Sequence, residues 1–285
     1  MNIFGLVMIF PLMMCCGDAI SDKEVVNNKD AVIEQQSHNQ CDSQNNVIPF
    51  GAQMLINAYP DAQLRYTDNK IIFPDGFSVV YDDKKNKTFI QQLDEADIED
   101  SFAMLYQIGG GTPEYQADGG RSRSDAFFKK MYGASQSEVS KNLTTINWFG
   151  TKVRVTTVNG VDEKLQAVAT ELASHPELKK YLKTAGTWNY RSVRGANRLS
   201  AHAYGIAIDI CVGYSDYWMW ANKKANENTK ITYKNRVPEK LVEIFEKHGF
   251  VWGGRWYHYD TMHFEYRPEI INAARQNEGK HQTDL

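Results

Sequence analysis

The feature that most restricts the fold is a short alternating run, IAIDI, at residues 206–210. Side chains along a β-strand point alternately to opposite faces, so the three isoleucines of this run share one face. Asp209 then lies on the other face, beside the small Ala207. The pattern predicts a strand that packs its isoleucines into a core and presents a single carboxylate on its other face.

A histidine just before this strand suggests what the carboxylate does. His202 is separated from the strand by Gly205. Because glycine adopts positive φ without steric cost, Gly205 allows the chain to turn and bring the imidazole back towards Asp209. A nitrogen donor and an oxygen donor together suit a borderline cation such as Zn²⁺.

A second segment, GFVWGGRWYHYDTMHFEYRP at residues 249–268, offers a third ligand. His258 and His263 are alternatives for this position, and their spacing leaves both open. Two histidines and one carboxylate leave the fourth tetrahedral position of zinc to water, as in catalytic sites. Two histidines also argue against a structural Ca²⁺ site, since Ca²⁺ prefers oxygen ligands.

Hydrolysis at such a centre needs two further groups. The attacking water requires a general base, and the oxyanion that forms requires a cation or hydrogen-bond donor. Asp260 and Arg191 suit these roles chemically. On a regular strand Asp260 and His263 face opposite sides, so the hypothesis requires a bend at residues 261–262.

Periodicity elsewhere predicts an α+β fold. Strand patterns with turn residues occur at residues 70–83 and 151–160, and helical spacing of apolar residues occurs at 94–109, 123–133, 162–172 and 238–249. Asp162 is expected to cap the clearest of these helices. Because the strands and helices show no βαβ rhythm, we expect a small antiparallel sheet with flanking helices that carries the metal site, preceded by an N-terminal extension.

The amino terminus, MNIFGLVMIFPLMMCCGD, is an apolar stretch too short to cross a bilayer comfortably, and polar sequence follows at once. It predicts an export signal, although no Lys or Arg precedes its apolar part. The Cys15-Cys16 pair stands where bacterial lipoproteins carry a lipidated cysteine, so simple cleavage and membrane attachment through one of these thiols both stay open. We expect an exported protein of the periplasm or cell envelope.

Two motifs combine these residues: S-x-H-x-x-G-x-A-x-D at residues 200–209 and D-x-x-H-F-E at residues 260–265. They resemble the motifs of the zinc D-Ala-D-Ala carboxypeptidase and L-Ala-D-Glu endopeptidase family, whose fold hedgehog signalling domains share. The resemblance implies that His202, Asp209 and His263 bind zinc and that Asp260 is the catalytic base.

The resemblance also bears on substrate contacts. It implies that Arg191 assists the oxyanion, with Arg194 and Arg198 as competitors for that role, and that Ser200 hydrogen-bonds the substrate. Aromatic residues bracket the motifs, and aromatic walls suit an extended peptide substrate. Tyr204 and Trp256 are therefore expected to bind substrate, although packing in the core is the alternative for such side chains.

The expected function is hydrolysis of peptide bonds in peptidoglycan stem peptides by zinc-activated water, of the D-Ala-D-Ala carboxypeptidase, L-Ala-D-Glu endopeptidase or D,D-endopeptidase type. A catalytically inactive zinc-containing module that binds the cell wall is the alternative, and the presence of Asp260 and Arg191 argues against it. A formal charge of −3 gives no basic excess for binding nucleic acid.

The expected domain organisation has five segments. They are a signal peptide at residues 1–20, a disordered polar tether at 21–47, a small N-terminal α/β region at 48–110, the zinc peptidase domain at 111–276 and a polar tail at 277–285.

Overall fold

The computed structural model describes residues 47–221 and 223–283. Its helices are α1 Phe50–Ala58, α2 Phe89–Asp94, α3 Asp100–Ala103, α4 Asp125–Tyr132, α5 Gln136–Lys141, α6 Val161–Ala173, α7 Trp218–Ala221, α8 Glu239–Lys247 and α9 Pro268–Thr283. Its strands are β1 Arg65–Thr67, β2 Lys70–Ile72, β3 Ser78–Val80, β4 Leu143–Trp148, β5 Thr151–Thr156, β6 Thr184–Gly186, β7 Ala207–Ile210, β8 Phe250–Trp252 and β9 His263–Tyr266. The predicted α+β class is confirmed.

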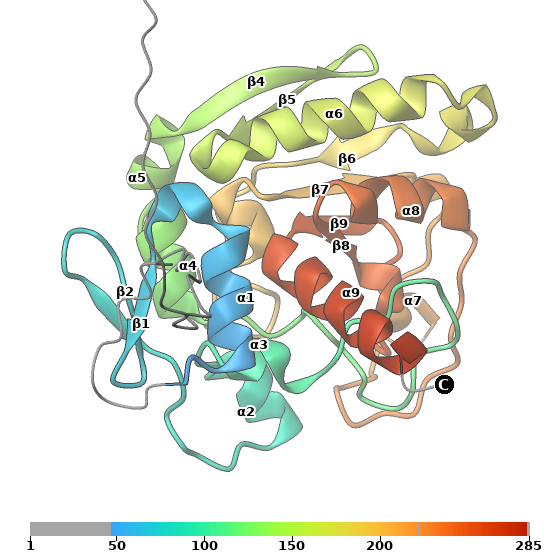
Figure 1. Ribbon diagram of the computed structural model, residues 1–285. Coiled ribbons are helices and arrows are strands. Elements are labelled where there is room, and N and C mark those ends of the chain that lie inside the picture. The colour runs from blue at the N-terminus through green and yellow to red at the C-terminus, as the bar shows by residue number, and fades with distance from the viewer. Residues whose placement is uncertain (1–46, 222, 284–285) are drawn as a thin grey trace, which may run out of the picture. The chain divides into compact units, whose positions relative to one another are not determined.

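The strands form three antiparallel sheets. The β1-β2-β3 sheet contains the hairpin predicted around Pro74 to Gly76, and β4 pairs with β5 in a second hairpin. The third sheet has the strand order β6-β7-β9-β8. In Figure 1 the β4–β5 hairpin and α6 lie along the β6 side of this third sheet. Helices α8 and α9 contact β8, the strand at its opposite edge.

The β6-β7-β9-β8 sheet carries the residues that the sequence singles out. Strand β7 covers the predicted alternating run, and Ile208 and Ile210 are fully buried, as expected. Strand β9 pairs antiparallel with β7 in a register that sets Asp209 directly opposite His263. Two candidate ligands that lie far apart in the sequence therefore become neighbours on one sheet.

One hydrophobic cluster joins the sheet to the helices around it. Phe245 of α8 stacks on Phe264 of β9 with ring centroids 3.9 Å apart. The same cluster includes Ile71 of the first sheet and Phe127 of α4. Helix α1 also packs beside α9, which connects the beginning of the described chain to its end (Figure 1). Residues on both sides of the boundary expected at 110–111 thus contribute to one core, and that boundary stays a prediction.

The local elements differ from the sequence expectation in two places. The helix expected within 94–109 is confined to α3, since Gly109 to Gly111 all have positive φ and Leu105 is 58% exposed. Helix α6 is preceded by Gly160 in the left-handed conformation, and Asp162 lies in its first turn without capping it. Gly160 can adopt this conformation because glycine tolerates positive φ.

The predictions for the amino terminus fall on residues 1–46, which lie outside the described residues. Among the residues that the structure describes, no helix has the length and apolar character needed to cross a membrane.

Candidate metal centre

His202 is positioned by a tight helical turn. It lies in the 3-10 helix Ala201–Tyr204, and the hydroxyl of Ser200 accepts a hydrogen bond from the His202 backbone N–H at 3.3 Å. Gly205 ends this helix with φ 72°. The predicted turn at Gly205 is therefore confirmed, and it allows His202 to face the strand that follows.

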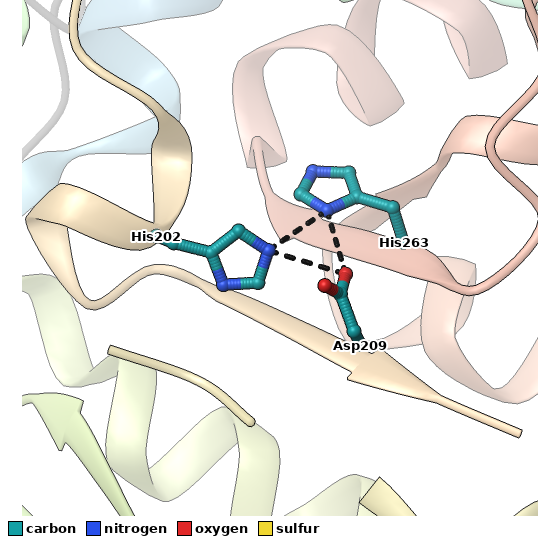
Figure 2. A group of neighbouring side chains, drawn as sticks. All are labelled: His202, Asp209 and His263. Atoms are coloured by element: carbon teal, nitrogen blue, oxygen red, sulfur yellow. Dashed lines mark hydrogen bonds and ion pairs between the residues drawn. The ribbon is translucent and has the colours of Figure 1, made fainter. Parts of the chain in front are cut away.

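The three candidate ligands meet at one point (Figure 2). Asp209 Oδ1 lies 3.1 Å from His202 Nε2 and 3.0 Å from His263 Nδ1. The two imidazole nitrogens are 3.2 Å apart. The 3-10 helix, β7 and β9 thus each contribute one donor atom to the same small space.

The outer nitrogens of the two imidazoles show which atoms face this point. His202 Nδ1 lies 2.5 Å from the backbone oxygen of Thr187, and His263 Nε2 lies 3.1 Å from Glu265 Oε2. A carbonyl and a carboxylate only accept hydrogen bonds, so these two ring nitrogens carry the protons. Neutral imidazoles of this tautomer present the unprotonated His202 Nε2 and His263 Nδ1 to Asp209.

Three lone pairs that converge in this way require a positive charge between them. Burial lowers the pKa of His263, but the carboxylates of Asp209 and Glu265 outweigh it and raise that pKa to about 10. Contacts with His202 and then His263 hold the pKa of the Asp209 carboxyl below its usual range despite burial. The position therefore favours a cation, either a proton or a metal ion.

The geometry of this ligand set suits zinc. Tetrahedral zinc with bonds of about 2.0–2.1 Å holds its ligand atoms about 3.3 Å from one another. The three separations found here are 3.0, 3.1 and 3.2 Å. Two imidazole nitrogens and one carboxylate oxygen are also ligands that zinc accepts readily. The residues present therefore fit zinc, and Glu265 and Thr187 orient the two imidazoles from outside the ligand set.

Asp260 lies beside this point. The chain turns at residues 261–262, where the sequence argument requires a bend. Asp260 Oδ1 is buried and has no hydrogen-bond partner among the described residues. Burial, and then the charge of Asp209, raises the pKa of the Asp260 carboxyl to about 6. A carboxyl with a pKa near neutrality is suited to exchange protons with water at physiological pH.

A pocket of about 450 Å³ contains the candidate ligands and Asp260. Five arginines line it: Arg121, Arg123, Arg191, Arg194 and Arg198. Arg198 is buried and pairs with Asp94 at 3.1 Å. Arg191 and Arg194 are exposed, and neither forms an ion pair within the described part of the chain. Of the three arginines proposed for the oxyanion, these two keep their guanidinium groups available.

The three residues expected to bind substrate do not all lie in the pocket. Ser200 and Trp256 line the pocket, and the indole of Trp256 lies 5.8 Å from the His263 ring. Tyr204 is not brought to the pocket: it is only 1% exposed and its hydroxyl donates a hydrogen bond to Asp125 Oδ1 at 2.9 Å. Its ring packs among other aromatic side chains, so the core alternative describes its position.

His258, the alternative ligand, lies on the same pocket but in a separate cluster. Its Nδ1 is 2.7 Å from Asp118 Oδ2. The guanidinium of Arg121 lies 2.8 Å from both Asp118 and Glu227, so it already supplies positive charge to these carboxylates. The cluster is an ion-pair network, and its side chains Asp118, Glu227 and His258 form a second group whose donor atoms lie close enough together to hold a metal ion. The structure groups His263, and not His258, with the other two ligands.

Sequence reasoning did not predict the contacts that several residues make around the site. Glu265 is fully buried beside His263, and Arg123 pairs with it. The sequence could have indicated the proximity of Glu265 to His263, because residues two apart on a strand share a face. Arg123 and Asp118 gave no such signal, since the fold brings them to the site from 142 and 140 residues away.

A pocket that combines a candidate metal-ligand set, a carboxyl with a raised pKa and arginines that are unpaired in the described part of the chain suits the chemistry of hydrolysis. A family model described as D-alanyl-D-alanine carboxypeptidase matches residues 194–266, which contain the three candidate ligands and Asp260. The resemblance inferred from the two motifs is confirmed for this part of the chain, which is similar to the D-alanyl-D-alanine carboxypeptidase family. No curated protein and no solved structure matches the chain.

Proposed function

We propose that this protein is a zinc metallopeptidase that hydrolyses a peptide bond in peptidoglycan stem peptides. The observation that carries the proposal is the convergence of three candidate ligand atoms, from His202, Asp209 and His263, in a pocket that also contains Asp260. Each of these groups alone has an ordinary structural explanation. Together they supply a ligand set with open coordination and a proton acceptor beside it.

Zinc, when bound, supplies the Lewis acid that polarises the substrate carbonyl and activates water. Asp260 contributes the proton acceptor. Its buried Oδ1 has no partner among the described residues, so it is available to water or substrate. After accepting the proton of the attacking water, Asp260 can pass it to the leaving amine, and a pKa of about 6 suits both transfers near neutral pH.

The remaining residues bind and orient the substrate. Arg191 supports the oxyanion, because its guanidinium lines the pocket and donates only one long hydrogen bond, at 3.3 Å, to the backbone oxygen of Ser192. Arg194 is the competitor that the structure leaves equally accessible. Ser200 can donate its hydroxyl proton to the substrate while its oxygen accepts from the His202 N–H, and Trp256 forms an apolar wall.

Two observations support peptidoglycan as the substrate. The matching family is described by its action on D-alanyl-D-alanine, the terminal dipeptide of stem peptides. The sequence also begins with an apolar stretch typical of exported proteins, followed by Cys15-Cys16. We propose export to the periplasm or cell envelope, with Cys15 or Cys16 as the site of lipid attachment if an anchor is present.

The test is to incubate purified protein with muropeptides that end in D-Ala-D-Ala, with zinc or with a chelator, and to read the products by mass spectrometry. We expect cleavage that the chelator abolishes and added zinc restores. Loss of one terminal alanine identifies a carboxypeptidase, while cleavage after L-Ala identifies an endopeptidase. A protein that binds zinc and cleaves neither bond is the binding module instead.

Asp260→Asn provides the matched variant for the proposed base. We expect it to lower turnover by about 10²- to 10⁴-fold while zinc content is unchanged. Asp162→Asn, a carboxylate on α6 outside the pocket, is the control. Full turnover by Asp260→Asn would remove Asp260 from the mechanism without affecting the metal ligands.

A further inference from the structure

Glu265 is a charged residue that the proposed reaction does not use. It lies two residues after His263 on β9, is fully buried, and accepts the hydrogen bond from His263 Nε2–H at 3.1 Å. This bond decides the tautomer of His263, since a proton on Nε2 leaves Nδ1 free to bind a metal ion. The orientation of one ligand therefore depends on where the Glu265 carboxylate is held.

Two buried arginines hold that carboxylate. Arg123 NH1 lies 3.1 and 3.0 Å from the two oxygens of Glu265, and Arg267 NH1 lies 3.2 Å from Oε1. A buried carboxylate stays ionised only with such partners.

The two arginines are not equivalent. Arg267 is also bonded to Glu269, so its charge is shared between two carboxylates. Arg123 bonds no other carboxylate in the described residues, and its second nitrogen donates to the backbone oxygen of Leu199 at 3.3 Å. Arg123 therefore bridges Glu265 to the segment that leads into Ser200 and His202.

Arg123 comes from outside the segment that the family model matches, residues 194–266. Its own segment is fixed against the site by backbone contacts. The indole N–H of Trp256 donates to the Gly119 oxygen at 2.9 Å, and Arg267 donates to the Gly120 oxygen at 2.7 Å. An added Cβ at Gly119 would lie 2.4 Å from the backbone of Leu105, so this segment has little freedom to move away.

We propose that Arg123 is a positioning residue of the metal centre, which holds Glu265 so that His263 presents Nδ1 to the ion. The inference rests on the proposed zinc site and deepens it: a residue of the chain preceding the matched segment completes the support of a ligand. Loss of Arg123 leaves Glu265 with only the shared charge of Arg267. Removing an outer partner of this kind lowers metal affinity by about 10- to 100-fold.

The test compares zinc affinity in the full chain, measured by competition with a chromophoric chelator. Arg123→Met keeps most of the side-chain length and removes the charge, and we expect zinc to bind it about 10- to 100-fold more weakly. Arg123→Lys keeps a charge and should recover part of the affinity. The absorption bands of the cobalt-substituted protein should shift in Arg123→Met, because they report the arrangement of the ligands.

Arg121→Met is the matched control. Arg121 is two residues away, lines the same pocket and is paired with Asp118 and Glu227, but it does not contact Glu265. We expect its zinc affinity to stay within about twofold of the native value, since it is outside the chain of contacts that supports His263. Equal weakening by both substitutions would overturn the proposal, as would native affinity in folded Arg123→Met.

Glu265→Gln is the second variant, needed if Arg123→Met does not fold. Glutamine keeps the size and the acceptor oxygen but removes the charge that Arg123 holds, so zinc affinity should again fall at least tenfold, and native affinity would refute the inference. Failure of the native protein to bind zinc would overturn both this inference and the zinc centre. Zinc binding without muropeptide cleavage would overturn the proposed function alone.

Discussion

Asp260→Asn should make the metal-free protein more stable at neutral pH while it removes activity. The carboxyl of Asp260 is placed where ionisation is costly, because Oδ1 is buried with no partner in the described part of the chain and Asp209 lies nearby. Asparagine has nearly the same shape and carries no charge. The substitution therefore removes the cost of a buried charge without changing the packing.

The magnitude follows from the pKa. The pKa of Asp260 rises from 3.8 to about 6 in the folded protein. At about 1.4 kcal/mol for each pKa unit, ionised Asp260 costs the folded state about 3 kcal/mol. Part of the side chain reaches solvent, so we expect about 2 kcal/mol.

The direction in which stability changes with pH depends on whether the folded or the unfolded state holds the Asp260 proton. Between about pH 4 and 6 the folded protein keeps the Asp260 proton and the unfolded chain has lost it, so stability falls as the pH rises through this window. Above about pH 6 both states are ionised and the cost is constant. The stability of Asp260→Asn does not fall in this way, because asparagine does not ionise.

Urea unfolding of the metal-free native and variant proteins, from about pH 4 to 8, measures the effect. The difference in unfolding free energy should be small near pH 4 and reach about 2 kcal/mol in favour of the variant at pH 8. Titrating groups that do not interact with Asp260 contribute equally to both proteins and cancel. Zinc should reduce the difference, since a nearby cation favours the ionised carboxylate. A difference that does not change with pH, or a less stable variant at pH 8, would refute the reasoning.

Three further outcomes are expected. Asp209→Asn should bind far less zinc, because a neutral amide replaces the charged ligand, and metal analysis after dialysis measures the loss. Tyr204→Phe should lower stability by about 1 kcal/mol through loss of the buried bond to Asp125 and leave KM unchanged, which separates a structural role from substrate binding. Gly205→Ala should lower the thermal midpoint, at a cost of about 1–3 kcal/mol, since φ is 72° and the added Cβ would lie 2.7 Å from Leu143.

The parts of the structure that the sequence predicts well are those set by neighbours along the chain. The buried isoleucines of β7 follow from a two-residue period, and the turn at Gly205 follows from the conformational freedom of glycine. Two candidate ligands could be placed relative to each other on these grounds alone. Both rules act over a few residues, so no knowledge of the tertiary fold is needed.

The parts that escaped prediction depend on contacts between distant segments. The choice between His258 and His263 is made by the turn at residues 261–262 and by Asp118, which binds His258 from 140 residues away. Tyr204 was expected in the pocket, but helix α4 provides a partner for its hydroxyl and aromatic rings for its face. Periodicity shows which face of an element is apolar and does not show what that face meets.

Asp209 and His263 lie directly opposite each other on β7 and β9, so metal binding depends on the register in which these two strands pair. A slip of one residue between two antiparallel strands moves every side chain of one strand to the opposite face. Such a slip would separate these two candidate ligands, so zinc at the proposed site would bind only the native register and would stabilise it by about 1.4 kcal/mol for each tenfold excess of free ion over Kd. The yield of correctly paired protein would then rise with the zinc concentration present while the chain folds, before any substrate is met.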